Sequence, residues 1–339
     1  MTRPATVFAA LTLALAAGCA QMMPEAGAPR EGFVTALARA LPFAVGVYGV
    51  ARAEPAAEGG AQAEAERGET VLPYARVGAG FMIDAAGHLV TAAHVVTDTD
   101  EVLVKLADQR VLRASVVGAD AELDVALLRI ASPGPVAPPL GRSSHLRPGH
   151  WVLSVGEPYG LNRSVAAGIV GGTDRHFSDD PELLYLQTDI ALNPGNSGGP
   201  LVDARGEIVG MNMRTVVGAY GTPGVSLSLP IEVVLAIAEE LRAGGIARPR
   251  LGAEFDDVSP QLALASGRGT TQGAVVTTVR RASLAERMGL RPDDVIVAMN
   301  DRPIGSSADL ARSLLGWRQP AGTKLVIWRG ASVLTLKLD

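Results

Sequence analysis

Cysteine is nearly absent from this 339-residue chain, and Cys19 is its only one. One cysteine cannot form an internal disulfide, and it cannot build a cysteine-based metal site. The five histidines do not change this conclusion, because neither His88 nor His176 stands at a metal-ligand spacing from other ligand residues. We therefore expect a protein that uses no metal and no other cofactor.

Basic runs and basic stripes are absent as well. Lys and Arg number 30 against 35 Asp and Glu, which leaves a net charge of −5. Without a concentrated positive surface, nucleic acid is not an expected partner. No tandem repeat of solenoid period occurs. The apolar fraction of 47% is ordinary for a globular protein, and the length predicts about two domains.

The N-terminus carries an apolar stretch, VFAALTLALAA over 7–17, that is too short for an ordinary membrane-spanning helix. Arg3 precedes this stretch and small residues follow it, which is typical of a secretory signal peptide. We assign residues 1–19 to the signal peptide.

The end of this signal, LAAGC over 15–19, resembles a bacterial lipoprotein box, although its leucine lies one place further upstream than usual. The resemblance implies lipidation of Cys19 and a periplasmic protein anchored to the membrane through that lipid. Plain cleavage near Ala20 is the alternative, and it would give a periplasmic protein without an anchor.

Two stretches have few bulky apolar residues. Residues 20–30 are rich in Pro, Ala and Gly, and with a short helix expected over 31–40 they make an N-terminal tether over 20–40. Residues 53–70 cannot bury an apolar face, so we interpret them as a flexible surface loop.

Short apolar runs alternate with turn residues up to the middle of the chain, and this spacing predicts an all-β barrel or sandwich. A helix is expected over 231–242, entered by Pro230 and stopped by Gly244 and Gly245. The expected strands are 41–50, 80–84, 88–92, 101–106, 111–118, 125–130, 151–156, 164–171, 184–189, 200–202, 208–214 and 225–229.

The pattern of apolar and turn residues changes in the last part of the chain, which follows an expected linker, GGIARPR over 244–250. A short helix is expected over 283–288, ending at Gly289. A second helix is expected from Ser307, because Ser306 and Asp309 stand at capping spacing. Strands are expected near Leu251, Gly273, Asp294 and Lys324.

Glycine is concentrated around one serine in NPGNSGGPLV, which runs over 193–202. Glycine weakens regular structure, so this cluster needs a reason. A serine hydroxyl becomes a nucleophile only beside a base, and its tetrahedral intermediate needs backbone N–H donors. Gly195 and Gly198 can give the backbone a shape that aims the amides of Gly195 and Ser197 at one point. Taken alone, the stretch also fits a tight turn.

The candidate base and its orienting acid are His94 and Asp124. LVTAAHVV places His94 at the end of a strand, beside small residues that leave space for an imidazole. Asp124 begins an apolar strand, where an unpaired acid is costly, and pairing with the Nδ1–H of His94 would remove that cost. Each residue alone also fits a structural role. The order His94, Asp124, Ser197 is that of chymotrypsin, whereas an α/β-hydrolase has its serine first.

Three blocks resemble the signature blocks of the HtrA/DegP family of trypsin-like serine proteases: GAGFMIDAAGHLVTAAHVV, DVALLRI and LQTDIALNPGNSGGPLV. The stretch over 273–304 is similar to that family's PDZ domain. The resemblance implies a mainly β fold, with a chymotrypsin-like double β-barrel protease domain over 41–243. A small α+β PDZ domain would follow over 250–339.

The resemblance also implies roles for particular residues. His94 would be the general base and acid, Asp124 would orient it, and Ser197 would be the nucleophile. The amides of Gly195 and Ser197 would form the oxyanion hole. The oxyanion loop could rest in an inactive arrangement until a ligand binds, with residues 193–196, 175–181 and 211–223 as the moving parts.

The same resemblance places Leu192 in the S1 pocket, with Leu227 and Leu229 across from it. An aliphatic lining disfavours charged P1 side chains, so we expect cleavage after Val, Ala or Leu. The family usually has a glycine-phenylalanine pair where this chain has Ser226 and Leu227, which affects the shape of S1 rather than the reaction.

The PDZ resemblance implies binding of peptides with hydrophobic C-termini by strand addition. The groove would lie between the strand near Leu251 and the helix over 307–315. The backbone near Arg250, Leu251 and Gly252 would cap the peptide carboxylate. Leu310 and Leu314 either line this groove or only fill the core.

The family implies a homotrimer or a multiple of trimers, and a regulatory loop at 53–70. The function that it implies is hydrolysis of unfolded or damaged envelope proteins in the periplasm. Two alternatives stay open: a catalytically silent PDZ chaperone or scaffold, and a narrow regulatory protease of envelope stress signalling. Silent relatives normally lose a triad member or an oxyanion glycine, and this chain retains them all.

Overall fold

The computed structural model describes residues 33–51, 75–131, 137–157, 163–177, 180–216, 224–245 and 249–338. The expected signal peptide, Cys19 and the loop over 53–70 lie outside these residues. Contacts divide the chain into two units, Met1–Thr35 and Ala36–Asp339, and the architecture below belongs to the second. No helix in the described segments is long and apolar enough to cross a membrane.

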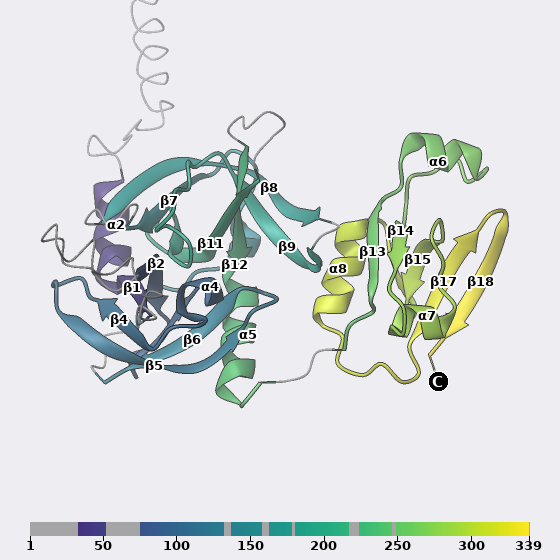
Figure 1. Ribbon diagram of the computed structural model, residues 1–339. Helices are drawn as coiled ribbons and strands as arrows, with labels where there is room; N and C mark the ends of the chain where they lie inside the picture. Colours follow the sequence, from purple (N-terminus) through teal and green to yellow (C-terminus); the bar gives the residue numbers. More distant parts are fainter. Residues whose placement is uncertain are drawn as a thin grey trace, which may run out of the picture. The chain divides into compact units, whose positions relative to one another are not determined.

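Six antiparallel strands close into a first barrel, in the order β1-β2-β3-β6-β5-β4 (Figure 1). Side chains alternate between the two faces of a strand, and in the fourth strand Val102 and Val104 point into the barrel while their neighbours do not. Val47, Leu89 and Leu128 join them in one buried cluster. The strands are β1 (Ala44–Val50), β2 (Ala75–Met82), β3 (His88–Thr91), β4 (Glu101–Lys105), β5 (Val111–Asp120) and β6 (Val125–Ile130).

A second closed barrel follows in the order β10-β11-β12-β9-β8-β7. Its interior is a cluster of aliphatic side chains that includes Val152, Leu186, Ile190 and Leu201. The strands are β7 (Trp151–Gly156), β8 (Ser164–Phe177), β9 (Asp180–Thr188), β10 (Pro200–Asp203), β11 (Ile208–Val216) and β12 (Val225–Pro230).

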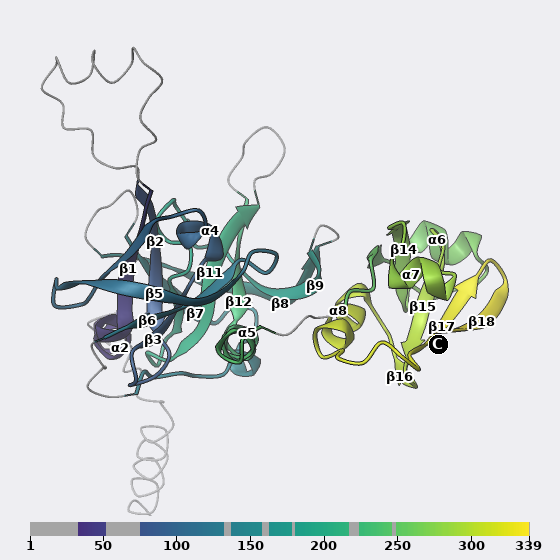
Figure 2. The same ribbon diagram turned by 60° about the horizontal axis from the view of Figure 1, so that its bottom comes forward.

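The helix α5 (Ile231–Arg242) packs against strands of both barrels, β5 and β6 of the first and β11 and β12 of the second. It is seen nearly end-on in Figure 2. Its buried residues recur at helical spacing, which is the pattern of an amphipathic helix. The helix ends before Gly244 and Gly245, which have φ angles of +95° and +82°. The buried residues are Ile231, Val234, Ile237, Ala238 and Leu241.

The C-terminal part of the chain is a separate sheet with three helices. The strand path is β13-β14-β15-β17-β18, and β16 pairs with β15. Its strands are β13 (Ala253–Asp257), β14 (Ala274–Val279), β15 (Val295–Met299), β16 (Arg302–Pro303), β17 (Lys324–Arg329) and β18 (Ser332–Lys337), and its helices are α6 (Pro260–Ala265), α7 (Leu284–Met288) and α8 (Ser307–Leu315).

The predicted cap of α8 is present, and α7 has a serine cap as well. The Ser306 hydroxyl accepts a hydrogen bond from the Asp309 N–H at 3.2 Å, and the Ser283 hydroxyl caps α7 in the same way. Gly289 ends α7 with a φ of +81°, the left-handed conformation that glycine adopts without strain. The capping spacing of Ser306 and Asp309 therefore predicted the start of α8, whereas α7 begins at Leu284 rather than at the expected residue 283.

The fold class is confirmed: the chain is mainly β, with two barrels followed by a smaller α+β part. Several elements differ from the expectation: β2 begins at Ala75 rather than at residue 80, β8 runs to Phe177 rather than to residue 171, and β18 was not expected. The first strand begins at Ala44, because Leu41–Phe43 forms a 3-10 turn around Pro42. The strand expected near Leu251 begins at Ala253, after Gly252 with its φ of +74°. Helix α6 was not expected. The short helix expected over 31–40 is α2 (Val34–Ala40).

Candidate active site

His94 and Asp124 form a doubly hydrogen-bonded pair. The backbone N–H of His94 donates to Asp124 Oδ1 at 2.8 Å, and its ring Nδ1 lies 2.8 Å from Oδ2 of the same carboxylate. A carboxylate oxygen only accepts, so we assign the ring hydrogen to Nδ1, and this leaves Nε2 as an acceptor. One carboxylate thus fixes both the backbone and the tautomer of His94.

The local backbone explains how the two residues meet. Asp124 directly precedes β6 with a φ of +53°, a left-handed conformation that aspartate tolerates better than most residues. The carbonyl of Asp124 accepts a hydrogen bond from the Ala93 N–H at 3.2 Å. The expected strand position of His94 is wrong, because β3 ends at Thr91 and His94 lies on the one-turn helix α4 (Ala93–Val96).

Arg76 on β2 holds the other end of α4. Its guanidinium donates to the carbonyl of His94 at 3.0 Å and to the carbonyl of Thr97 at 2.5 Å. The last carbonyls of a helix have no partner within the helix, and a basic side chain satisfies them well. With Asp124 at one side and Arg76 at the other, α4 has a fixed orientation. The His94 side chain is nevertheless 55% exposed, so its ring is open to a substrate.

Ser197 lies between the two barrels. Its carbonyl accepts a hydrogen bond from the Ala79 N–H in β2 at 2.9 Å, which ties it to the first barrel. Its hydroxyl donates to the carbonyl of Met213 in β11 at 3.1 Å, which belongs to the second barrel. The hydroxyl therefore rests on a backbone carbonyl rather than on His94.

The glycines after Ser197 permit close approaches of backbone to backbone. A Cβ added at Gly198 would lie 2.4 Å from the carbonyl oxygen of Ala79 and 2.5 Å from the backbone nitrogen of Ala92. A Cβ at Gly199 would lie 2.3 Å from the carbonyl oxygen of Val155. Because Ala92 is two residues before His94, this packing brings the serine loop against the segment that carries the imidazole.

Gly195 has a φ of +102°, a conformation that only glycine adopts readily. The turn before Ser197 is closed by a hydrogen bond from the Asn196 N–H to the Asn193 carbonyl at 3.0 Å. The carbonyl of Gly195 accepts the N–H of Glu157 at 3.1 Å. The unusual backbone of this loop is therefore held by specific partners.

Asn212 in β11 supports this loop, a role that was not predicted from the sequence. Its side-chain Nδ2 donates to the Ser154 hydroxyl at 2.8 Å and to the carbonyl of Pro200 at 3.2 Å, while the Ser228 hydroxyl donates to its Oδ1 at 3.1 Å. Its backbone carbonyl accepts from the Gly198 N–H at 2.8 Å. The signal in the sequence is one asparagine inside the apolar run IVGMNM, since a buried amide must be hydrogen-bonded.

The candidate S1 residues occupy different environments. Leu192 is partly buried and packs against the second-barrel cluster that contains Ile190. Leu227 and Leu229 in β12 are completely buried. On the alternate positions of the same strand, the Ser226 hydroxyl donates to the carbonyl of Ile190 at 2.5 Å. Through this bond, β12 is joined to Ile190, which lies two residues before Leu192.

Three of the candidate PDZ residues share one apolar cluster: Leu251, Leu310 and Leu314. A Cβ at Gly252 would lie 2.4 Å from Cβ of Ser283, so only glycine fits there. The carbonyls of Leu251 and Gly252 accept the N–H groups of Ala285 and Arg280, at 2.8 Å and 2.9 Å. These bonds hold the residues before β13 against the start of α7, and Arg250 directly precedes them.

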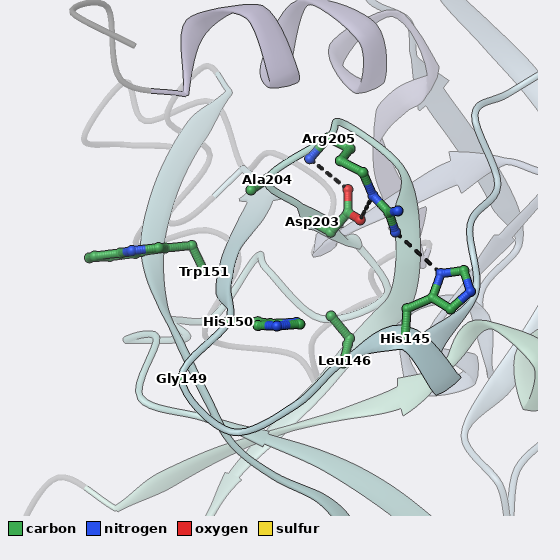
Figure 3. A pocket seen from close by; sticks show the side chains of 8 residues that line it. All are labelled: His145, Leu146, Gly149, His150, Trp151, Asp203, Ala204 and Arg205. Carbon is green, nitrogen blue, oxygen red and sulfur yellow. Dashed lines mark hydrogen bonds and ion pairs between the residues drawn. The ribbon is translucent and has the colours of Figure 1, made fainter. Parts of the chain in front are cut away.

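A pocket of about 430 Å³ lies on the second barrel (Figure 3) and contains none of these candidate residues. Within it, Arg205 donates to Asp203 at 3.0 Å and lies 3.3 Å from Nδ1 of His145, so its charge is already paired. In the described parts of the chain, no group of three or more His, Cys, Asp or Glu residues could hold a metal ion. The pocket is lined by His145, Leu146, Gly149, His150, Trp151, Asp203, Ala204 and Arg205.

Comparison with known proteins agrees with this geometry. Residues 78–211 match the family described as trypsin-like peptidase domain, and residues 275–329 match the PDZ domain. The solved structure "HtrA-type protease AlgW with tripeptide" is 30% identical, with a TM-score of 0.73, and the match covers 90% of this chain and 95% of that one. The chain belongs to the HtrA family.

Curated relatives of this HtrA-family chain carry the name "Probable periplasmic serine endoprotease DegP-like". The relative from Ectopseudomonas mendocina (strain ymp) is 39% identical over 285 residues, covering 84% of this chain and 58% of the relative. That from Pseudomonas putida (strain GB-1) is 38% identical over 279 residues, covering 82% of this chain and 58% of the relative. The chain therefore spans less than two thirds of the length of these relatives.

The matched ranges contain most of the candidate residues of this HtrA-family protein. The peptidase match includes His94, Asp124 and Ser197, and the PDZ match includes Leu310 and Leu314. Arg250, Leu251 and Gly252 lie before the PDZ match.

Proposed function

We propose that this HtrA-family protein is a periplasmic serine endopeptidase that hydrolyses unfolded or damaged envelope proteins. The observation that carries the proposal is the pair of 2.8 Å hydrogen bonds from His94 to one carboxylate, beside the glycine-rich loop of Ser197. The names of the curated relatives support both the serine endoprotease activity and the periplasmic location.

In the proposed reaction, the Ser197 hydroxyl leaves the carbonyl of Met213 and turns toward Nε2 of His94. Nε2 takes the hydroxyl proton as Oγ forms a bond to the scissile carbonyl carbon, and Asp124 stabilises the imidazolium. The imidazolium then gives its proton to the leaving amine, and the C–N bond breaks. A water molecule, activated by His94 in the same way, hydrolyses the acyl-enzyme.

The oxyanion of the tetrahedral intermediate would be held by the amides of Gly195 and Ser197. The left-handed φ of Gly195 supports this role, because it turns consecutive N–H groups out of a regular ladder. One such donor contributes about 2.7–4 kcal/mol to transition-state stabilisation. The oxyanion loop, residues 193–196, would therefore add to the rate enhancement that the three side chains give.

The proposed S1 pocket has Leu192 at its wall, with Leu227 and Leu229 across from it. An apolar wall leaves a charged P1 side chain without a partner, which is costly when that side chain is buried. We expect cleavage after Val, Ala or Leu. Mass-spectrometric mapping of cleavage sites checks this preference, and a majority of Arg, Lys or Asp at P1 would contradict it.

The proposed PDZ domain, residues 250–339, would bind hydrophobic C-terminal peptides next to β13, with a carboxylate cap at Arg250, Leu251 and Gly252. We propose the protease domain over 41–243, a homotrimer or multiple of trimers, and a signal peptide over 1–19. A lipid on Cys19 would then anchor the protein to the membrane. Labelling with a fatty-acid probe and its loss in Cys19→Ala checks the anchor.

The first experiment compares the mature protein with Ser197→Ala on reduced casein, following fragments over time. Degradation by the wild type alone supports a serine endopeptidase with Ser197 as nucleophile. Degradation by both proteins would contradict that role. If neither degrades casein, peptides with hydrophobic C-termini are added, and continued inactivity would favour a PDZ scaffold. Activity restricted to one substrate would favour a narrow regulatory protease.

A further inference from the structure

Glu157 directly follows β7 and lies against the candidate oxyanion loop. Its backbone N–H donates to the carbonyl of Gly195 at 3.1 Å. The residue before it, Gly156, lies so close to Asn196 that an added Cβ would be 2.8 Å from the Asn196 Cα. The end of β7 and the loop over 193–196 are thus in backbone contact.

The side chain of Glu157 leaves the second barrel and enters the first. Its Oε1 lies 2.9 Å from Nζ of Lys105 on β4, and its Oε2 accepts a hydrogen bond from the Tyr48 hydroxyl on β1. The carboxylate is only 2% exposed. Gly46 provides the space, because a Cβ at that position would lie 2.6 Å from Oε2. A backbone position that holds Gly195 is therefore anchored in the opposite barrel.

Both donors stay protonated at neutral pH. Burial raises the pKa of Tyr48, and the hydrogen bond to Glu157 raises it further. Burial acts to lower the pKa of Lys105, but the hydrogen bonds and charge interactions with Glu157 and Tyr48 together outweigh burial, and the pKa is raised. The carboxylate therefore keeps two donors, one charged and one neutral.

This arrangement is not explained by stability alone. A buried ion pair is a weak source of stability, because desolvation of both charges offsets their attraction. Its geometry, in contrast, is specific, and removal of one partner leaves a buried charge unpaired. The side-chain Oδ1 of Asn196 is buried without a hydrogen-bond partner among the described residues, so this atom does not anchor the loop.

We propose that Glu157 is a positioning residue for the oxyanion hole: its carboxylate, held by Lys105 and Tyr48, fixes the N–H that clamps the Gly195 carbonyl. The clamp fixes the peptide plane between Gly195 and Asn196, and with it the direction of the neighbouring amides. This inference rests on the proposed serine endopeptidase reaction. In this proposal, residues of the first barrel help to position the oxyanion hole, although the oxyanion loop itself belongs to the second barrel.

The test uses Glu157→Gln in the full mature chain, which keeps the side-chain size and removes the charge. The matched control is Asp203→Asn. Asp203 is also a buried carboxylate in an ion pair, with Arg205, and it pairs with Val152 at the other end of β7. The control thus perturbs the same barrel away from the loop.

Three quantities are measured at a temperature where every variant is folded. They are kcat and KM on a peptide taken from a mapped casein cleavage site, and the affinity for a boronic acid of the same peptide. Boron bonded to Ser197 Oγ becomes tetrahedral and places an oxygen at the oxyanion position. We expect Glu157→Gln to lower kcat about 10–100-fold, less than loss of a whole donor, with KM within about twofold.

The boronate affinity should fall in parallel with kcat, whereas Asp203→Asn should change neither quantity beyond about twofold. Hydrogen exchange should increase for peptides that cover residues 193–199 in Glu157→Gln. A merely structural role would raise exchange across the barrel and leave the ratio of boronate affinity to KM unchanged. An unchanged kcat and boronate affinity in Glu157→Gln would overturn the proposal.

If Glu157→Gln does not fold, Tyr48→Phe tests the proposal instead, because it removes one hydrogen bond to Glu157 and leaves the ion pair of Glu157 with Lys105. A several-fold loss of boronate affinity at unchanged KM supports the proposal, and wild-type affinity overturns it. Failure of the proposed function looks different: the wild type itself would then show no Ser197-dependent turnover. The two outcomes are therefore distinguishable in one set of proteins.

Discussion

Replacing Gly198 by alanine tests whether close packing explains the glycine that follows Ser197. Gly198 has a φ of +83°, and an added Cβ would meet the backbone of Ala79 at 2.4 Å and of Ala92 at 2.5 Å. Neither atom is the end of a flexible side chain, so the barrel itself must shift. Gly149 is a matched control, because its φ is +94° and nothing lies within 4 Å of an added Cβ.

Both variants place a Cβ on a left-handed backbone, but only Gly198→Ala also overpacks its surroundings. A left-handed conformation costs a residue with a Cβ about 1–2 kcal/mol, and Gly149→Ala should lose about that much unfolding free energy. Overpacking typically adds about 1–3 kcal/mol, so Gly198→Ala should lose about 2–5 kcal/mol. For a protein stable by about 5–15 kcal/mol, this difference is large enough to measure.

Urea unfolding of both variants at 25 °C, read from tryptophan fluorescence, gives the two losses directly. Activity on a peptide substrate should fall about 100-fold or more in Gly198→Ala, because Ser197 is displaced with the backbone. Gly149→Ala should keep its activity. Equal losses of stability in the two variants would refute the steric argument, and backbone strain alone would then explain the glycine.

Other predictions concern the pair of His94 and Asp124, the donors Tyr48 and Lys105 around Glu157, and Leu310 in the PDZ part. Asp124→Asn should lower kcat about 10⁴-fold with KM little changed, because an amide favours the wrong tautomer of His94; steady-state kinetics check this. The raised pKa values of Tyr48 and Lys105 stabilise the fold below their ordinary values of 10.0 and 10.5, and this contribution is lost as pH rises further. The urea midpoint should therefore fall above pH 10, less steeply in Tyr48→Phe. Leu310→Ala should destabilise the PDZ part by about 2–5 kcal/mol, seen in thermal unfolding, because its side chain is completely buried.

Local signals allowed several features to be predicted from the sequence. Ser306 caps its helix where the spacing indicated, because a cap depends on residues three positions apart. The pairing of His94 with Asp124 was predictable for another reason: an acid at the start of a buried strand needs a partner, and few candidates exist. The S1 and PDZ assignments stay predictions.

Other features depend on contacts between distant segments and left almost no local signal. The one-turn helix that carries His94 is held by Arg76 from β2 and by Asp124, which directly precedes β6. The roles of Asn212 and Glu157 depend on which strands the barrels bring together, and neither residue stands in a motif that reveals its partners. The need for glycine at position 46 was unpredictable for the same reason, since its lack of a Cβ matters only once Glu157 lies against it.

The contacts around Ser197 show how the site depends on both barrels. The Ala79 N–H bonds to the Ser197 carbonyl, the backbone of Gly198 packs against Ala92, and the Glu157 carboxylate reaches Lys105. Each of these contacts joins a first-barrel residue to the serine loop or to the strand that clamps it. A shift of one barrel against the other would therefore move the base relative to the nucleophile and the oxyanion loop. Substitutions at this junction should change the rate more than they change substrate affinity, because a displacement of about 1 Å costs about 100-fold in rate even where binding contacts survive.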